Sequence, residues 1–278
     1  MKLCICQIIK DEHPYIEEWI EYHYNLGFEK FYLIEDWNSL SHKSLLNKYN
    51  YVELYKLLDI INYEEKEILL NPKKYFEYTS IHRQRIVYHV FDRLWKNNYD
   101  WMAFIDVDEF IDINKNDLYK ILLQNKNQPI VTMTWKHMDA NNYINHPNNW
   151  KKYSVVNTYT HEFSSVFNTK QIINCNAKFN FLTKESEWMS FPHAINNNGV
   201  VNNYSGNIYL KHFMCKSLEE WIWRLQNKGE STEDHRINRK LEDWFYINTK
   251  YLDQKNELLE KYLPNDFKIK YNDYNLKI

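Results

Sequence analysis

Glycine is scarce in this chain, which has four glycines in 278 residues: Gly27, Gly199, Gly206 and Gly229. A phosphate-binding loop of the P-loop or dinucleotide type needs clustered glycines, because its backbone must approach the phosphates closely. None of the four has a glycine neighbour at the required spacing, and the chain also lacks a nucleophile elbow and an HExxH helix. If a nucleotide binds, something other than a glycine loop must hold its phosphates.

Cysteine is also sparse. The four cysteines, Cys4, Cys6, Cys175 and Cys215, lack the paired spacing of a zinc site or a disulfide framework. Cys4 and Cys6 would lie on one face of a strand, where a metal pair is the alternative to packing. We predict reduced thiols buried in the core.

Neither an excess of one charge nor a long apolar run is present. The formal net charge is -2, which gives no electrostatic argument for a nucleic-acid partner. No apolar stretch approaches the roughly 18 residues that a membrane-spanning helix needs. Residues 1–9 predict a first strand and not a signal peptide. We expect a cytoplasmic location, while a peripheral membrane association and the oligomeric state stay open.

The chain is rich in apolar segments of strand length, separated in its first half by helix-like segments. A stripe of apolar residues at helical spacing predicts a long helix over residues 80–96. Such alternation is typical of an α/β fold with a mainly parallel, mixed sheet flanked by helices. The predicted strands are residues 3–9, 31–35, 52–57, 101–105, 130–135 and 164–167.

The last part of the chain predicts helices. Residues 217–226 open with a capping box, Ser217 with Glu220, and a charged helical segment runs from Arg239 to Pro264. We predict one domain over residues 1–235 and a C-terminal helical extension over residues 236–278.

Two carboxylates, Asp106 and Asp108, follow the continuously apolar residues 101–105. Extended geometry would put both on one side of the chain, where they repel each other unless a cation lies between them. A hard divalent ion bound by carboxylates and substrate phosphates resolves that conflict. The carboxyl ends of strands are also where open α/β sheets bind ligands. The pattern favours a metal site over its alternative, a solvated loop.

Three ordered segments resemble the glycosyltransferase family 2-like and family 92 group. They are Ile9-Lys10-Asp11-Glu12 with the following residues to Leu33, Trp101 to Phe110 (WMAFIDVDEF), and Lys211-His212-Phe213 with Lys216 to Trp221. The resemblance covers roughly residues 3 to 230. It implies a GT-A fold, in which a Rossmann-like sheet binds the nucleoside and the aspartate motif holds Mn²⁺ or Mg²⁺ on the donor diphosphate.

The resemblance also implies which residues bind the donor. Residues at the ends of the first two strands would line a nucleoside pocket. Gln84 and Tyr88 match a Q-x-x-x-Y pattern ahead of the metal motif and would face the donor, although a tyrosine at this spacing is more often packing. The pocket residues are Lys10, Asp11, Glu12 and Asp36.

A histidine late in the chain is the implied third protein ligand of the metal. His212 looks like the C-terminal histidine of several GT-A families, and a neutral imidazole suits Mn²⁺. His193 is a weaker alternative. Lys216 could neutralise a donor phosphate. The predicted metal ligands are therefore Asp106, Asp108 and His212.

Inversion at the anomeric carbon needs a general base on the acceptor side, distinct from the metal ligands. Asp139 follows a predicted strand in the region where relatives carry W-x-x-(F/Y)-G-x-x-G, but this chain lacks those glycines. Asp139 is the first candidate for the base, and Glu162 and Glu109 are the alternatives.

The sequence thus predicts a metal-dependent inverting glycosyltransferase that moves a sugar from a nucleotide sugar, a UDP-hexose, to a glycan or glycolipid. One alternative is a carbohydrate-binding module, because ten tryptophans and 23 tyrosines could stack on sugar rings. Another is a metal-dependent nucleotidyltransferase or phosphodiesterase, which would need a second acidic cluster that the sequence does not offer.

Overall fold

The computed structural model describes residues 1–37, 39–71, 82–177, 208–225 and 241–262. The chain forms two compact units. The first comprises Met1–Trp135 and Val166–Lys211, and the second comprises Lys136–Ser165 and His212–Ile278. The predicted boundary between residues 235 and 236 lies outside the described residues.

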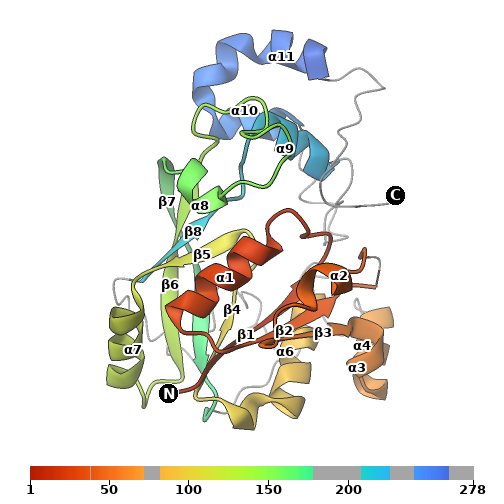
Figure 1. Cartoon of the computed structure of the whole chain (residues 1–278), viewed down its shortest axis with the longest axis vertical. Coiled ribbons are helices and arrows are strands. Elements are labelled where there is room, and N and C mark those ends of the chain that lie inside the picture. The colour runs from red at the N-terminus through yellow and green to blue at the C-terminus, as the bar shows by residue number, and fades with distance from the viewer. Residues whose placement is uncertain (38, 72–81, 178–207, 226–240, 263–278) are drawn as a thin grey trace. The chain divides into compact units, whose positions relative to one another are not determined.

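Eight strands of the described residues form one mixed sheet in the order β3-β2-β1-β4-β7-β6-β8-β5 (Figure 1). Strand β1 pairs in parallel with both β2 and β4, and β2 pairs in parallel with β3, whereas β4 and β7 are antiparallel. The predicted α/β class, with a sheet flanked by helices as in a Rossmann-like GT-A fold, is confirmed. The strands are β1 Leu3–Ile9, β2 Lys30–Glu35, β3 Val52–Lys56, β4 Trp101–Phe104, β5 Glu109–Asp112, β6 Ile130–Met138, β7 Glu162–Asn174 and β8 Tyr209–His212.

The helices of the first unit are α1 Ile16–Leu26, α2 Lys43–Leu46, α3 Leu57–Ile60, α4 Tyr63–Leu70, α6 His82–Leu94, α7 Lys115–Gln124 and the short 3₁₀ helix η2 Lys96–Asn98. Those of the second unit are α8 Val155–Thr158, α9 Leu218–Trp223, α10 Leu241–Ile247, the 3₁₀ helix η6 Thr249–Gln254 and α11 Lys255–Tyr262. Within the described parts of the chain, no helix combines the length and the apolar character that crossing a bilayer requires.

Helix α6 covers one face of the parallel strands. Its apolar stripe packs with Cys4 and Cys6 of β1 and with Tyr32 of β2 in one buried core. The four cysteines are buried free thiols, as predicted, and burial raises the pKa of the Cys4 and Cys6 thiols above the ordinary value. These cysteines are therefore packing residues of the core.

Helix α1 lies on the opposite face, because Phe31, which contacts α1, alternates along β2 with Tyr32 (Figure 1). Trp19 of α1 packs edge-on against Phe31, and its indole N–H donates to the carbonyl of Glu109, 2.9 Å away. The helix ends at Gly27, whose φ of 113° lies in the left-handed region. Gly27 thus ends the helix, and α1 is anchored beside the chain that follows Asp106 and Asp108.

The second unit has its own core around Trp244 of α10. Its indole N–H donates to the Lys216 carbonyl at 2.9 Å, just before α9 begins. The predicted capping box is present, because the Ser217 hydroxyl accepts from the Glu220 N–H and the Glu220 carboxylate accepts from the Ser217 N–H. Cap and core together fix the start of α9 after His212 and Lys216.

Buried His23 of α1 makes the stability of the first unit depend on pH. Its Nδ1 donates to the Trp19 carbonyl at 2.8 Å and its Nε2 accepts from the Ile111 N–H at 3.3 Å, so the neutral ring uses both nitrogens. Burial lowers the pKa of His23 to about 3. An unfolded histidine has a pKa of about 6.5, so between these values the unfolded chain binds a proton that the folded chain does not.

We expect the free energy of unfolding to fall as the pH falls from about 6.5 towards 4, with His23 contributing about 1.4 kcal/mol per pH unit. Urea unfolding of the wild type and of His23→Gln across this range measures the contribution. The variant should lose stability less steeply than the wild type. Equal slopes would show that His23 is not a neutral buried residue in the folded state.

Candidate functional site

Asp106 and Asp108 lie in a tight turn that follows β4. The strand ends at Phe104, and the Glu109 N–H donates to the Asp106 carbonyl at 3.0 Å, which closes the turn before β5 begins. The predicted extended geometry is wrong here because this hydrogen bond bends the chain. The buried side chain of Val107 anchors the turn between the two half-buried aspartates.

Three elements of the first unit converge on the Asp106 carboxylate. Its Oδ1 accepts from the side-chain amides of Gln7 on β1, at 2.6 Å, and Gln84 on α6, at 3.3 Å. Its Oδ2 accepts from Nζ of Lys170 on β7, at 2.8 Å. The structure thus brings predicted donor-site residue Gln84 to predicted metal ligand Asp106, and adds Gln7 and Lys170.

Lys170 is a completely buried lysine that faces two carboxylates. Besides Asp106, its Nζ lies 3.6 Å from Oε2 of Glu109. Burial alone would lower the pKa of Lys170, but the charges of Asp106 and Glu109 outweigh burial and raise it. Sequence reasoning missed Lys170, because its partner Asp106 lies 64 residues away in the chain.

The side chain of Glu109 stabilises the turn of Asp106 and Asp108 through a hydrogen bond. Its Oε2 accepts from the Asp106 N–H at 2.8 Å, and its side chain is fully buried. Burial raises the pKa of this carboxyl well above its ordinary value. The structure therefore shows Glu109 as a buried support of the aspartate turn. Its role as a general base stays a prediction.

The carboxylate ligands of the aspartate motif fit a metal ion that a substrate also coordinates. Among the described residues, no three His, Cys, Asp or Glu side chains gather closely enough to hold a metal ion by themselves. Mg²⁺ and similar ions typically take one or two protein carboxylates and complete their shell with substrate phosphates and water. The half-buried carboxylates of Asp106 and Asp108 supply that many.

The predicted nucleoside residues lie on two adjoining loops of the first unit. Asp11 has a φ of 51°, and its carboxylate accepts from the Leu40 N–H at 2.8 Å. Asp36 is buried and forms an ion pair with Arg83 of α6 at 2.8 Å. Lys10 and Glu12 are half-buried on the first loop. The structure brings the predicted residues of the two loops together through Asp11 and Leu40.

Two stacked histidine rings hold the loops after β1 and β2 together. The rings of His13 and His42 are 3.9 Å apart, and Nε2 of His42 accepts from the Glu12 N–H at 3.0 Å. Nδ1 of His42 lies 3.1 Å from the Glu35 carboxylate, which fixes the tautomer. Burial lowers the pKa of His13 to about 4, with His42 contributing. The loops after β1 and β2 are therefore rigidly connected.

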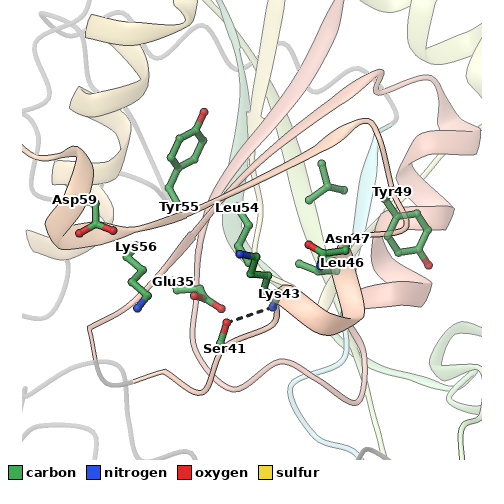
Figure 2. A pocket seen from close by; sticks show the side chains of 11 residues that line it. Glu35, Ser41, Lys43, Leu46, Asn47, Tyr49, Leu54, Tyr55, Lys56 and Asp59 are labelled. Carbon is green, nitrogen blue, oxygen red and sulfur yellow. Dashed lines mark hydrogen bonds between the residues drawn. The ribbon is translucent and has the colours of Figure 1, made fainter.

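A cavity of about 420 Å³ opens beside this stack, and Figure 2 shows Glu35, Lys43 and Tyr55 among its lining side chains. Its size is within the range of small-molecule sites. The lining comes from β2, β3, the segment between them and α3, and it does not include Lys10, Asp11, Glu12 or Asp36. The lining residues are Glu35, Ser41, Lys43, Leu46, Asn47, Tyr49, Val52, Leu54, Tyr55, Lys56 and Asp59.

Tyr88 is a core residue. Its side chain is fully buried, and its ring centroid lies 3.6 Å from that of Phe104 on β4. This agrees with the packing interpretation of a tyrosine at helical spacing. A role for Tyr88 towards the donor stays a prediction.

The remaining predicted site residues belong to the second unit. His212 is buried with its ring 5.0 Å from that of His137, and Lys216 is buried with Nζ donating to the Phe213 carbonyl at 3.0 Å. Glu162 is exposed, and its Oε2 lies 3.7 Å from Nζ of Lys136. That His212 and Lys216 complete a site with the aspartate motif stays a prediction, and His193 lies outside the described residues.

Asp139 is paired with a histidine. Its Oδ2 accepts from Nδ1 of His161 at 2.8 Å, and its Oδ1 accepts from the Asn141 N–H at 2.7 Å. Asn141 and Asn142 have φ values of 45° and 72°. Asparagine tolerates this left-handed region better than most residues, so the loop after β6 takes its positive φ values without a glycine.

No family model matches the chain, and no curated protein matches it. The solved structures to which the chain is similar include two with low identity and low TM-score. The crystal structure of HddC from Yersinia pseudotuberculosis has 13% identity and a TM-score of 0.33, covering 66% of this chain and 84% of HddC. The X-ray structure of the mannosyltransferase Ktr4p from S. cerevisiae has 14% identity and a TM-score of 0.26, covering 53% of this chain and 41% of Ktr4p.

The buried ion pair of Lys170 predicts a large cost of removing the lysine. Lys170→Met would leave the fully buried Glu109 and the half-buried Asp106 without their cation, so we expect a loss of about 3–5 kcal/mol of unfolding free energy. Lys211→Met is the matched control. Lys211 pairs with Asp112 at 3.0 Å, but its side chain is 29% exposed, and such pairs contribute about 0–1 kcal/mol. Chemical unfolding of both variants gives the comparison, and equal losses would contradict the assigned role of Lys170.

Proposed function

We propose that this protein is a metal-dependent inverting glycosyltransferase that moves a sugar from a nucleotide sugar, a UDP-hexose, to a glycan or glycolipid acceptor. The observation that carries the proposal is the turn of Asp106 and Asp108 at the carboxyl end of β4. This strand lies beside β1 in the parallel part of the sheet, where α/β proteins bind their ligands. The side chains of Gln7 and Gln84 converge on the same carboxylate.

Asp106 and Asp108 would hold Mn²⁺ or Mg²⁺, with His212 as the proposed third protein ligand. When bound, the ion would neutralise the negative charge of the departing nucleoside diphosphate. Lys170 fixes the orientation of Asp106 through its 2.8 Å contact, so that the carboxylate is held in place before the donor arrives. Lys216 is proposed to neutralise a donor phosphate, a task that a chain with four glycines cannot give to a glycine loop.

The two locked loops after β1 and β2 are proposed to bind the nucleoside. They carry Lys10, Asp11, Glu12 and Asp36. The positive φ of Asp11 supports this assignment, because strained backbone is concentrated at functional sites. The contact of Asp36 with Arg83, and of Arg83 with the Trp37 ring at 4.5 Å, would present a rigid surface to a ligand.

Removing one carboxylate of the turn tests the proposed metal site. In a thermal-shift screen of UDP-glucose, UDP-galactose and UDP-N-acetylglucosamine, we expect at least one donor to raise the melting temperature only when Mn²⁺ is present. A ligand at 100 times its Kd stabilises by about 2.7 kcal/mol. Asp108→Ala should abolish the Mn²⁺-dependent shift and transfer activity, whereas Asp112→Ala, which removes a carboxylate in the same strand region, should keep both.

Three outcomes would overturn the proposal. Full metal-dependent transfer and donor hydrolysis by Asp108→Ala at saturating donor would show that the turn of Asp106 and Asp108 takes no part in the mechanism. Glycan binding by calorimetry without any effect of sugar nucleotides or Mn²⁺ would instead identify a carbohydrate-binding module. Turnover of a nucleoside triphosphate or nucleic acid, without any effect of sugar nucleotides, would identify a nucleotidyltransferase or phosphodiesterase.

A further inference from the structure

The cavity along β2 and β3 of the first unit combines cationic, anionic and apolar side chains. We propose that it binds a small sugar phosphate, at a site separate from the aspartate turn, and that this ligand acts on the loops after β1 and β2. The volume of about 420 Å³ is within the range of small-molecule sites. The described residues that line the cavity do not include those of the aspartate turn.

The floor of the cavity is one face of two paired strands. In the parallel pairing of β2 and β3, Leu33 lies beside Leu54 and Glu35 lies beside Lys56. Side chains two residues apart along a strand share a face, so Glu35, Leu54 and Lys56 all point to the face that Phe31 presents to α1. The floor therefore joins an aliphatic surface to a carboxylate and an ammonium group.

Two lysines, Lys43 and Lys56, bring positive charge to the cavity (Figure 2). Both are exposed and, among the residues that the structure describes, neither ammonium group takes part in an ion pair. Their charges are therefore available to a ligand, and a lysine ammonium is a usual partner of phosphate. The Asn47 amide and the Ser41 hydroxyl of the same lining are further donors for phosphate oxygens.

Two carboxylates of the lining can accept hydrogen bonds from sugar hydroxyls. Glu35 is buried, and its Oε1 already accepts from the His42 N–H at 2.5 Å. Burial would raise the pKa of Glu35, but the hydrogen bonds from His42 outweigh burial and lower it, which keeps this carboxylate ionised. Asp59 of α3 supplies the second carboxylate. Two carboxylates repel a bare phosphate ion, so the lining favours a phosphate that carries a hydroxylated body.

Two lining residues are hydrogen-bonded directly to the stacked histidine rings. Nδ1 of His42 donates to Oε1 of Glu35 at 3.1 Å, and Nε2 of His13 donates to the Ser41 carbonyl at 3.2 Å. On the other side of the His42 ring, Nε2 accepts from the Glu12 N–H at 3.0 Å. A ligand that contacts Glu35 or Ser41 therefore acts on the loop after β1 through these hydrogen bonds.

Isothermal titration calorimetry of the full chain with glucose 1-phosphate tests the site, and inorganic phosphate and glucose are the comparison ligands. We expect glucose 1-phosphate to bind more tightly than either. Lys43→Met and Lys56→Met should each raise its Kd about fivefold, which corresponds to the loss of one exposed ion pair, and added salt should weaken binding. Lys66→Met, which removes an exposed lysine outside the lining, is the matched control.

Nuclear magnetic resonance of the histidine side chains locates the bound probe. Glucose 1-phosphate should shift the ring signals of His13 and His42. It should leave unchanged the signals of His89, which pairs with Glu65 at 2.7 Å in the same unit. Asp108→Ala should bind the probe as the wild type does, because the cavity is separate from the aspartate turn.

Each measurement has an outcome that would overturn the proposed site. No binding of glucose 1-phosphate, an unchanged Kd in both lysine variants, or loss of binding in Asp108→Ala would show that the cavity is not the site. Equal affinity for inorganic phosphate would overturn the assignment to a sugar phosphate, and unshifted His13 and His42 signals would overturn the action on the loops. Neither measurement uses Mn²⁺ or a UDP-sugar. A protein that binds glucose 1-phosphate in this way but no UDP-sugar would instead contradict the proposed transfer alone.

Discussion

The contact between Lys170 and Asp106 places a buried positive charge directly against the aspartate motif. Removing a lysine and a carboxylate from water costs several kcal/mol per ion, and only close pairing with further hydrogen bonds offsets that cost. Here the offset comes from Asp106 at 2.8 Å, Glu109 at 3.6 Å, and the amide of Gln7 on the other Asp106 oxygen. Strands β1, β4, β5 and β7 are thereby coupled at one point. The orientation of Asp106 is built into the core and does not depend on a flexible loop.

Much of the fold was predictable because the spacing of apolar residues and the signals that start and end helices agree along the chain. The apolar runs predicted β1, β2 and β3 within one residue, and the Ser217 capping box was confirmed. The predictions missed β5, Glu109–Asp112, and β8, Tyr209–His212, and underestimated β7, Glu162–Asn174. Strands β5 and β7 contain buried polar residues, Glu109 and Lys170, that pair with each other across 61 residues of sequence. A buried ion pair interrupts the apolar pattern that identifies a strand.

The site was predictable as a set of residue types and less so as a geometry. Spacing indicated that Asp106 and Asp108 act together, but a backbone hydrogen bond to Glu109 turns the chain where extended geometry was expected. The role of Lys170 depends on its ion pair with Asp106, which lies 64 residues away in the sequence. No local pattern reveals such a pair. Likewise, Asp139 was singled out by its position after a strand, whereas its partner His161 is 22 residues further on. Long-range contacts decide which of two groups is exposed.

The central claim is that the turn of Asp106 and Asp108 holds the metal that accompanies a nucleotide sugar. Anomalous diffraction at the manganese edge, from crystals grown with Mn²⁺ and UDP, tests it most directly. The account predicts one strong manganese peak between the UDP diphosphate and the Asp108 carboxylate, with Lys170 still paired to Asp106. A manganese–UDP complex seated away from this turn would contradict it.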